Sequence, residues 1–207
     1  MRYIQKNNTE PASFTRWKGK ASADWEPTFE NMNSAVKKDI KSALKKEQLG
    51  LCCYCESKLR DDYSHIEHFR PQETYKWLSL DYGNMLCSCQ SNLKKGDPIH
   101  CGNAKDNWFD ESLTISPLSR DCASHFRYTG DGHVYPADEH DSAAIATIEH
   151  LKLDIRKLVD SRQEVINAFL DPKISDAEFK RFYDLYFRNL SAENPPEFIS
   201  AIIDVFK

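Results

Sequence analysis

The sequence lacks any apolar run that could cross a membrane. No stretch of its 207 residues approaches the roughly 18–20 consecutive apolar residues that a transmembrane helix requires. The charged N-terminal residues are not followed by an apolar segment, so the sequence carries no recognisable secretion signal. Internal repeats, low-complexity segments and an obvious linker are also absent. We therefore expect a cytoplasmic protein without membrane contact, built as one compact unit.

An excess of positive charge is missing as well. Lysine and arginine number 28 against 32 aspartate and glutamate residues, which gives a net charge of −4. Phosphate affinity comes mainly from lysine and arginine. A nucleic-acid-binding function therefore requires either that the basic residues are grouped around one site or that a partner protein supplies most of the contacts. The candidates for phosphate contact are Arg70, Lys94, Lys95 and Lys105, and an ordinary solvated surface explains each of them equally well.

The seven cysteines cannot all pair with one another, because their number is odd. In a reducing compartment, clustered cysteines indicate metal binding rather than disulfides. Cys52 and Cys55 have the spacing with which one turn presents two thiolates to a tetrahedral zinc ion. The candidates for a second pair are Cys87, Cys89, Cys101 and, as a substitute, His100. We favour Cys89 and Cys101, a four-thiolate site that would contribute roughly 10 kcal/mol to folding; buried free thiols are the alternative.

The pattern around these cysteines predicts a small ββα unit. Residues 64–69 and 82–86 read as short extended segments, and the chain is expected to turn helical past Leu86. Such a unit buries little surface, so a structural metal ion makes physical sense. The fold class we predict is α+β, mostly α. Its parts are an N-terminal arm and helix (1–50), a zinc-stabilised core (51–140) and a C-terminal helical region (141–207).

Outside this core the elements are read from apolar spacing and turn residues. A helix is expected from about residue 28 to 49, followed by a stop at Gly50. Residues 126–136 read as a hairpin with a Gly-Asp-Gly turn. Apolar residues between 145 and 169 trace one side of a single long helix, and a capping-box pattern opens a further helix at Ser175.

Glu67 and His68 are the candidate catalytic pair, at the end of the first predicted strand. A histidine with a pKa near neutrality can take a proton from water, and a carboxylate can hold a divalent cation. These are the components that phosphodiester hydrolysis requires. His65 lies two residues before Glu67, so on a strand the two side chains point to one side. Three roles remain open for His65: a second metal ligand, a hydrogen-bond donor to phosphate, or a histidine of the core.

The segments IEHFRP (66–71), YGNML (82–86) and CGNAK (101–105), framed by the cysteine pairs, resemble the HNH (His-Me finger) endonucleases. The resemblance implies that His68 is the general base, that Asn84 braces the loop between the strands, and that Glu67 holds magnesium or another divalent cation. Asn103 is the best match to the third signature position, where it would also hold the cation. Asn92 competes with it, because the segment between Cys89 and Cys101 is longer than the compact family pattern.

A closer resemblance covers much of the chain. The start of the sequence, CCYCE (52–56), residues 65–71, HCGN (100–103) and SPL (116–118) are similar to PtuB proteins, the HNH effectors of bacterial Septu anti-phage systems, some of them linked to retrons. The family implies a PtuA-type ATPase as partner, a nucleic-acid substrate (DNA, or RNA such as tRNA) and, in some systems, a retron reverse transcriptase with its msDNA. The alternative is a non-catalytic zinc-ribbon adapter in a partner complex.

Overall fold

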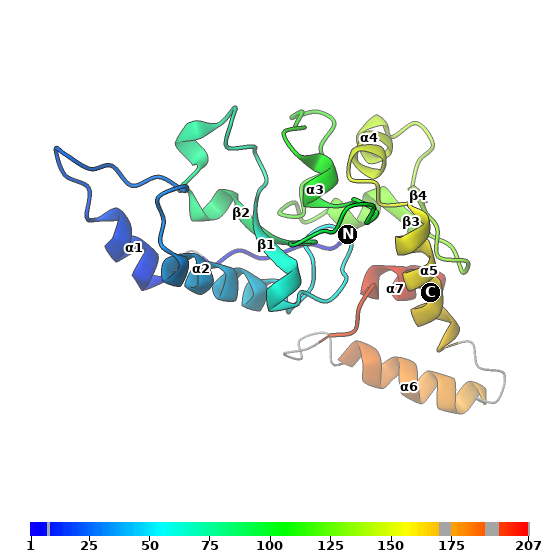
Figure 1. Cartoon of the computed structure of the whole chain (residues 1–207). Helices are drawn as coiled ribbons and strands as arrows, with labels where there is room; N and C mark the ends of the chain where they lie inside the picture. The colour runs from blue at the N-terminus through cyan, green and yellow to red at the C-terminus, as the bar shows by residue number, and fades with distance from the viewer. Residues whose placement is uncertain (8, 170–174, 189–194, 207) are drawn as a thin grey trace.

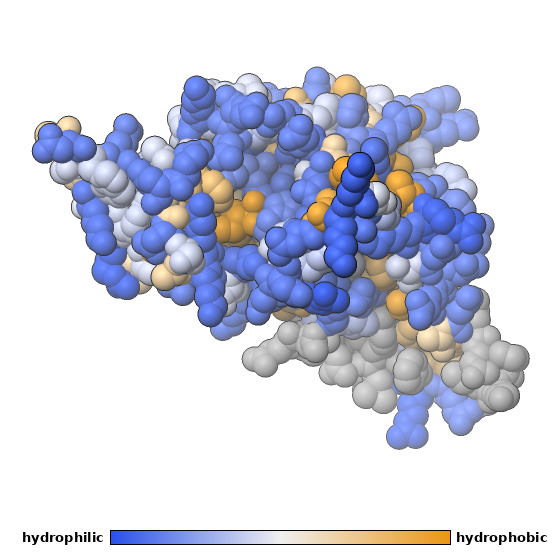
Figure 2. Space-filling view, in the orientation of Figure 1, coloured by the Kyte–Doolittle hydropathy of each residue, from blue (hydrophilic) through white to orange (hydrophobic). Residues whose placement is uncertain are grey.

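A computed structural model describes residues 1–7, 9–169, 175–188 and 195–206 (Figure 1). The regular secondary structure of this part of the chain is mostly helical, with two small antiparallel sheets. It therefore matches the expected α+β, mostly α class. Every helix within these ranges is too short or too polar to cross a membrane. The face seen in Figure 2 is predominantly hydrophilic, and its apolar residues form small separate patches.

The N-terminal part contains α1 (Ala12–Lys18) and α2 (Ser34–Glu47). The Asn33 side chain accepts a hydrogen bond from the backbone N–H of Val36 at 3.0 Å, which is the geometry of a helix N-cap. The predicted start near residue 28 was therefore wrong, because the helix begins at this cap. Val36, Ile40 and Leu44 are buried at a spacing of four, as the apolar pattern indicated.

The first sheet pairs β1 (Ser64–His68) with β2 (Met85–Cys89) in antiparallel register, with Ile66 opposite Cys87. The second strand was predicted at 82–86 and lies three residues later. Tyr82–Asn84 instead forms a 3-10 turn, in which the Asp81 side chain accepts a hydrogen bond from the Gly83 N–H at 2.8 Å. This local bond between a side chain and the backbone competes with the extended conformation.

The chain past Leu86 was expected to be helical, and this was also wrong. β2 continues to Cys89, and the next helix, α3, is the single turn Gly102–Lys105. α2 packs against both strands of the sheet. α3 lies on the other side, where Gly102 approaches His65 and Glu67 (Figure 1). The remaining 3-10 segments are Asp61–Tyr63, Lys76–Leu78 and Cys122–His125.

The C-terminal part opens with the predicted hairpin, formed by β3 (Phe126–Tyr128) and β4 (Val134–Pro136). Its helices are α4 (Ser142–His150), α5 (Arg156–Asn167), α6 (Asp176–Arg188) and α7 (Ile199–Val205). The single long helix predicted over 145–169 was wrong. It is divided between α4 and α5, and Lys152 in the connection has a left-handed φ of 49°.

α7 returns to the cysteine-containing turn. The buried Glu56 carboxylate accepts hydrogen bonds from the Ser200 N–H at 2.9 Å and from the Ser200 hydroxyl at 2.5 Å. This contact joins residues 144 positions apart in the sequence. The division into regions 1–50, 51–140 and 141–207 stays a prediction.

Candidate functional site

Four buried thiols form a compact cluster. They are those of Cys52, Cys55, Cys89 and Cys101, the set favoured from the sequence, and their sulfur atoms all lie within 4.8 Å of one another. Four soft sulfur donors at this separation suit a tetrahedral zinc ion. The cluster could therefore hold a metal ion such as zinc.

The local backbone explains how the first two thiols converge. The Cys52 N–H donates to the Ser57 carbonyl at 2.8 Å, and the Glu56 N–H donates to the Cys52 carbonyl at 3.1 Å. Glu56 has a left-handed φ of 66°, which closes this turn. Burial alone would raise the pKa of Cys55, but the hydrogen bond from Cys101 opposes burial, and the pKa falls to about 6. The pKa values of Cys89 and Cys101 are raised instead, so the convergence of the four sulfur atoms, and not their pKa values, supports metal binding.

His100 lies beside the cluster and is not one of its four convergent donors. Its Nδ1 is 3.1 Å from the Cys101 sulfur and 3.8 Å from that of Cys89, and its backbone N–H donates to the Gln90 side-chain oxygen at 2.8 Å. An imidazole next to a ligating thiolate orients that ligand and tunes its charge.

Two further thiols lie near the cluster. Cys53 is buried in the same turn and outside the cluster, and Cys87 lies in the middle of β2. Burial raises the pKa of Cys53 well above its usual range and that of Cys87 to about 12. Both lie outside the four convergent sulfur atoms, so the geometry favours Cys89 over Cys87 as a ligand of the second pair.

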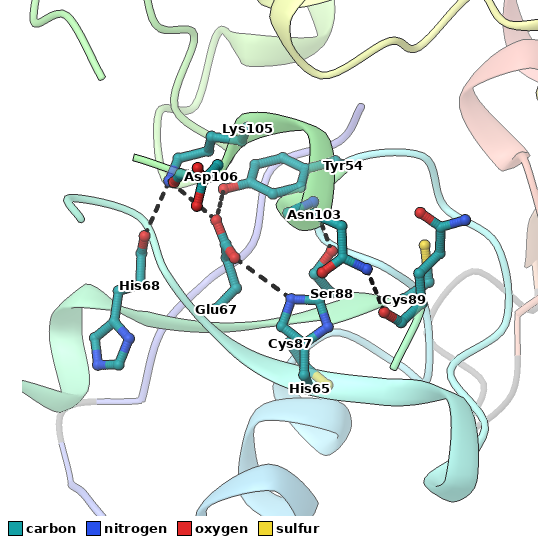
Figure 3. Close-up of polar contacts among 12 residues, drawn as sticks. Tyr54, His65, Glu67, His68, Cys87, Ser88, Cys89, Asn103, Lys105 and Asp106 are labelled. Atoms are coloured by element: carbon teal, nitrogen blue, oxygen red, sulfur yellow. Dashed lines mark hydrogen bonds and ion pairs between the residues drawn. The ribbon is translucent and has the colours of Figure 1, made fainter. Parts of the chain in front are cut away.

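A second polar cluster surrounds Glu67 on the α3 side of the sheet (Figure 3). Its Oε1 accepts a hydrogen bond from the Tyr54 hydroxyl at 2.9 Å and lies 3.1 Å from the Lys105 ammonium. Its Oε2 faces His65 Nε2 at 3.5 Å. Gly102 closes the cluster, because a Cβ there would lie 2.5 Å from Oε2 of Glu67. Sequence analysis missed Tyr54 and Gly102, and neither residue type signals such a role.

Lys105 is buried at 1 % exposure and also donates to the His68 carbonyl at 3.1 Å. A buried lysine requires a counter-charge, and Glu67 provides it. Burial tends to raise the pKa of Glu67, but the hydrogen bond from His65 and the charge of Lys105 outweigh it and lower the pKa. The Glu67 carboxylate is therefore ionised at neutral pH. This placement does not match the phosphate-contacting surface role expected for Lys105.

The contacts of Glu67 show whether its carboxylate could hold the divalent cation that the resemblance implies. Both carboxylate oxygens already have partners, and one of those partners is a cation. A magnesium ion on Glu67 would meet the ammonium of Lys105. The side chains as they lie therefore do not form a magnesium site.

The imidazole of His68 points away from the Glu67 carboxylate (Figure 3), as alternation along a strand dictates. Its Nε2 lies 3.0 Å from the Ser79 carbonyl oxygen, and the Phe29 ring packs edge-on against it with centroids 4.6 Å apart. A carbonyl oxygen only accepts, so Nε2 carries the hydrogen and Nδ1 keeps a lone pair. Burial lowers the pKa of His68, which favours the neutral imidazole.

Asn84 lies under the loop that joins the two strands. Its side-chain oxygen accepts from the Arg70 N–H at 2.8 Å, and its amide donates to the carbonyls of Arg70 at 3.0 Å and Leu78 at 3.4 Å. The Phe69 N–H donates to the Asn84 carbonyl. These bonds fix the loop just after His68; the part of Asn84 in orienting the base stays a prediction.

The two candidates for the third signature position both bind main-chain carbonyls. Asn103 is half-buried and donates to the carbonyl of Gln90, whereas Asn92 is exposed and donates to that of Asp62 at 2.8 Å. The structure brings neither amide into a recorded contact with Glu67. Which of them corresponds to the third position stays a prediction.

The remaining basic candidates lie at the surface. Arg70 pairs with Glu111 at 2.9 Å and lies near the rings of Tyr75 and Phe109. Lys94 and Lys95 are exposed. Their contact with nucleic acid stays a prediction.

The fold and the two clusters define a class: an α+β chain with a buried four-thiol site and a carboxylate–histidine pair at the end of a short strand. No family model matches the chain. A candidate HNH endonuclease of retron Vc95 from Vibrio cholerae serotype O1 biovar El Tor is 29% identical over 160 residues, which are 65% of this chain and 76% of that protein.

Two proteins named Septu protein PtuB are also similar. That of Bacillus mycoides strain KBAB4 is 30% identical over 149 residues, which are 61% of this chain and 50% of the relative. That of Bacillus thuringiensis is 40% identical over 72 residues, 33% of this chain and 28% of the relative. The chain thus matches about half or less of the length of each PtuB. These similarities confirm the predicted resemblance to PtuB-like HNH proteins.

Proposed function

We propose that this chain is an HNH endonuclease that hydrolyses phosphodiester bonds of nucleic acid in anti-phage defence. The observation that carries the proposal is the Glu67–His68 pair at the end of β1, in a chain whose relatives bear the names HNH endonuclease and PtuB. A pure binding module has no need of this pair. The substrate is DNA, with RNA such as tRNA as the alternative.

His68 is the general base of the proposed reaction. The Ser79 carbonyl holds its Nε2–H, so Nδ1 is the atom that takes a proton from water. The water oxygen forms a bond to phosphorus in line with the departing 3′ oxygen, and the bond from phosphorus to that oxygen breaks. The 3′ oxygen leaves with the electron pair and takes a proton from solvent, so the products are a 5′ phosphate and a 3′ hydroxyl. The lowered pKa supports this role, because a base must be unprotonated before it acts.

The structure supports the two metal ions of the proposal to different degrees. Zinc is assigned to the four thiols, where it would be structural. The resemblance further implies a catalytic cation, usually magnesium, on Glu67 and Asn103. Because Lys105 occupies the Glu67 carboxylate, that assignment requires a rearrangement of the lysine, and the role of His68 does not depend on it.

The names of the relatives also support the proposed partners. We propose a PtuA-type ATPase that restrains the nuclease until infection and, in a retron-linked system, a reverse transcriptase with its msDNA. A partner that contributes phosphate contacts is compatible with the net charge of −4.

The test compares wild type with His68→Ala and, as a matched control, His140→Ala, which removes an exposed histidine. Each protein is incubated with the partner, labelled DNA or RNA, and magnesium or manganese. We expect His68→Ala to lower the cleavage rate by about 10²–10⁴-fold and His140→Ala to leave it unchanged. Equal rates in wild type and His68→Ala would remove the catalytic assignment.

The rival function is a zinc-containing adapter that joins a partner complex and cuts nothing. The neutralised Glu67–Lys105 pair favours it, because a charge pair buried in this way also serves as plain structural support. Complex formation by the wild type without cleavage under all of these conditions would favour the adapter.

A further inference from the structure

An open groove of roughly 640 Å³ lies between α2 and the neighbouring residues of β1. Three lysines of α2, Lys37, Lys38 and Lys41, line it on the helix side. Phe29 and the β1 residue His65 also contribute to its walls. The groove is separate from the basic residues that the sequence singled out. A KK-x-x-K spacing on the predicted helix was the signal that could have found it.

The groove concentrates positive charge in a chain that is negative overall. Residues four apart lie on one side of a helix, so Lys37 and Lys41 are neighbours, with Lys38 beside them. The acidic residue of the lining, Asp61, is already paired with Lys45 at 2.5 Å. The lysines therefore retain a positive charge that a bound anion could neutralise.

The lysines differ in how firmly they are held. The Lys41 ammonium donates to the carbonyls of Asp61 at 2.6 Å and Ser64 at 3.0 Å, so it connects α2 to the start of β1. The Lys37 ammonium lies 4.8 Å from the centre of the Phe29 ring, and Lys38 is exposed. Substitution of Lys37 and Lys38 thus removes charge without breaking the bonds of Lys41.

Two residues in the wall of the groove each contact one member of the candidate catalytic pair. Phe29, which forms part of its wall, packs against the imidazole of His68. His65, also in the wall, faces Glu67 at 3.5 Å. A strand of nucleic acid in the groove would therefore contact residues that touch each member of the pair to which we assign the chemistry.

We infer that this groove binds the sugar–phosphate backbone of the substrate, with Lys37 and Lys38 as phosphate contacts. The inference rests on the proposed nuclease function and names the surface that receives its substrate. Ammonium groups are contacts to phosphate that carry no base information, so the groove would set affinity and register rather than sequence preference.

The test measures the binding of a fluorescein-labelled 20-nucleotide strand, as DNA and as RNA, by anisotropy without added divalent cations. The groove variant is Lys37→Gln/Lys38→Gln. Its matched control is Lys20→Gln/Lys46→Gln, which removes the same charge from exposed positions outside the groove. Both are compared with wild type between 50 and 200 mM KCl, with thermal melting to verify folding.

We expect the groove variant to bind about tenfold more weakly and its log Kd–log salt slope to decrease by roughly 1.4–1.8, since each phosphate contact contributes about 0.7–0.9. The control should stay within about twofold of wild type. An equal loss in both variants, no loss in either, or no binding by wild type would overturn the inference.

Cleavage measured in parallel separates this inference from the function itself. If the groove variant binds like wild type and wild type cleaves the substrate, the inference about the groove is wrong and the proposed nuclease function is unaffected. A groove variant that alone loses binding, while wild type does not cut, supports the groove and counts against the nuclease.

Discussion

The two polar clusters of this molecule differ in their residue types and in the directions in which their side chains point. The thiols of Cys52, Cys55, Cys89 and Cys101 are alike, and all four point at one centre. Around β1, the Glu67 carboxylate and the His68 imidazole point to opposite faces of one strand, and a lysine already neutralises the carboxylate. The thiol cluster could hold a metal ion without rearrangement. The second has a base in a suitable tautomer but must rearrange to accept a cation.

The largest expected effect tests the thiol cluster. Cys55→Ser should remove the bound zinc and most of the roughly 10 kcal/mol that such a site contributes to folding. Thermal melting and elemental analysis of the purified protein measure both changes. Cys53→Ser, in the same turn but outside the cluster, should retain the metal and lose only about 1–2 kcal/mol. Similar melting and metal content in both variants would contradict the assignment.

A smaller effect is expected at the second cluster. Lys105→Met should destabilise the fold by about 3–5 kcal/mol, because it leaves the buried Glu67 carboxylate without its counter-charge. Denaturant unfolding measures the loss, and magnesium or manganese titration shows whether the vacated carboxylate gains affinity for the cation. Arg70→Met, which breaks the exposed pair with Glu111, should cost less than about 1 kcal/mol. Equal losses of unfolding free energy in the two variants would mean that the buried pair contributes no more to stability than the exposed one.

The smallest expected effect is a pH dependence. The pKa of Glu67 is lowered in the fold, so between that pKa and the ordinary value of 4.5 the unfolded chain binds more protons. The stability that Glu67 contributes is therefore complete above pH 4.5 and is lost as the pH falls below it. The gap in unfolding free energy between wild type and Glu67→Gln should narrow below pH 4.5. Protonation of the thiols affects both proteins alike, and a constant gap would refute the prediction.

The same comparison explains what the sequence could predict. Cys52 and Cys55 could be chosen because their residue type and spacing are chemically restrictive, whereas Cys89 and Cys101 were only favoured among several candidates. β1 was recognised to within one residue. The start of β2 could not be placed, because the bond from Gly83 to Asp81 competes with strand formation. The break between α4 and α5 was also hidden, because apolar spacing continues through Lys152 despite its left-handed backbone.

The candidate site was less predictable than the fold. Adjacent positions identified Glu67 and His68, but only the structure shows the neighbours of each side chain. Lys105 looked like a surface residue because lysines are almost never fully buried, and its partner lies 38 positions earlier. The lysines of the groove belong to α2, whose position relative to β1 depends on tertiary packing.

α3 links the two clusters through one helical turn. Cys101 immediately precedes it and Lys105 ends it, and a helix of four residues has no stability of its own in water. Its geometry is therefore maintained by the contacts of its two ends, with Cys101 in the thiol cluster and Lys105 at Glu67. Oxidation of the thiols, or removal of their metal ion by a chelator, should therefore also weaken the contact between Lys105 and Glu67 at the other end of this turn. A change in the redox state of the cell would in this way alter the surroundings of the Glu67 carboxylate.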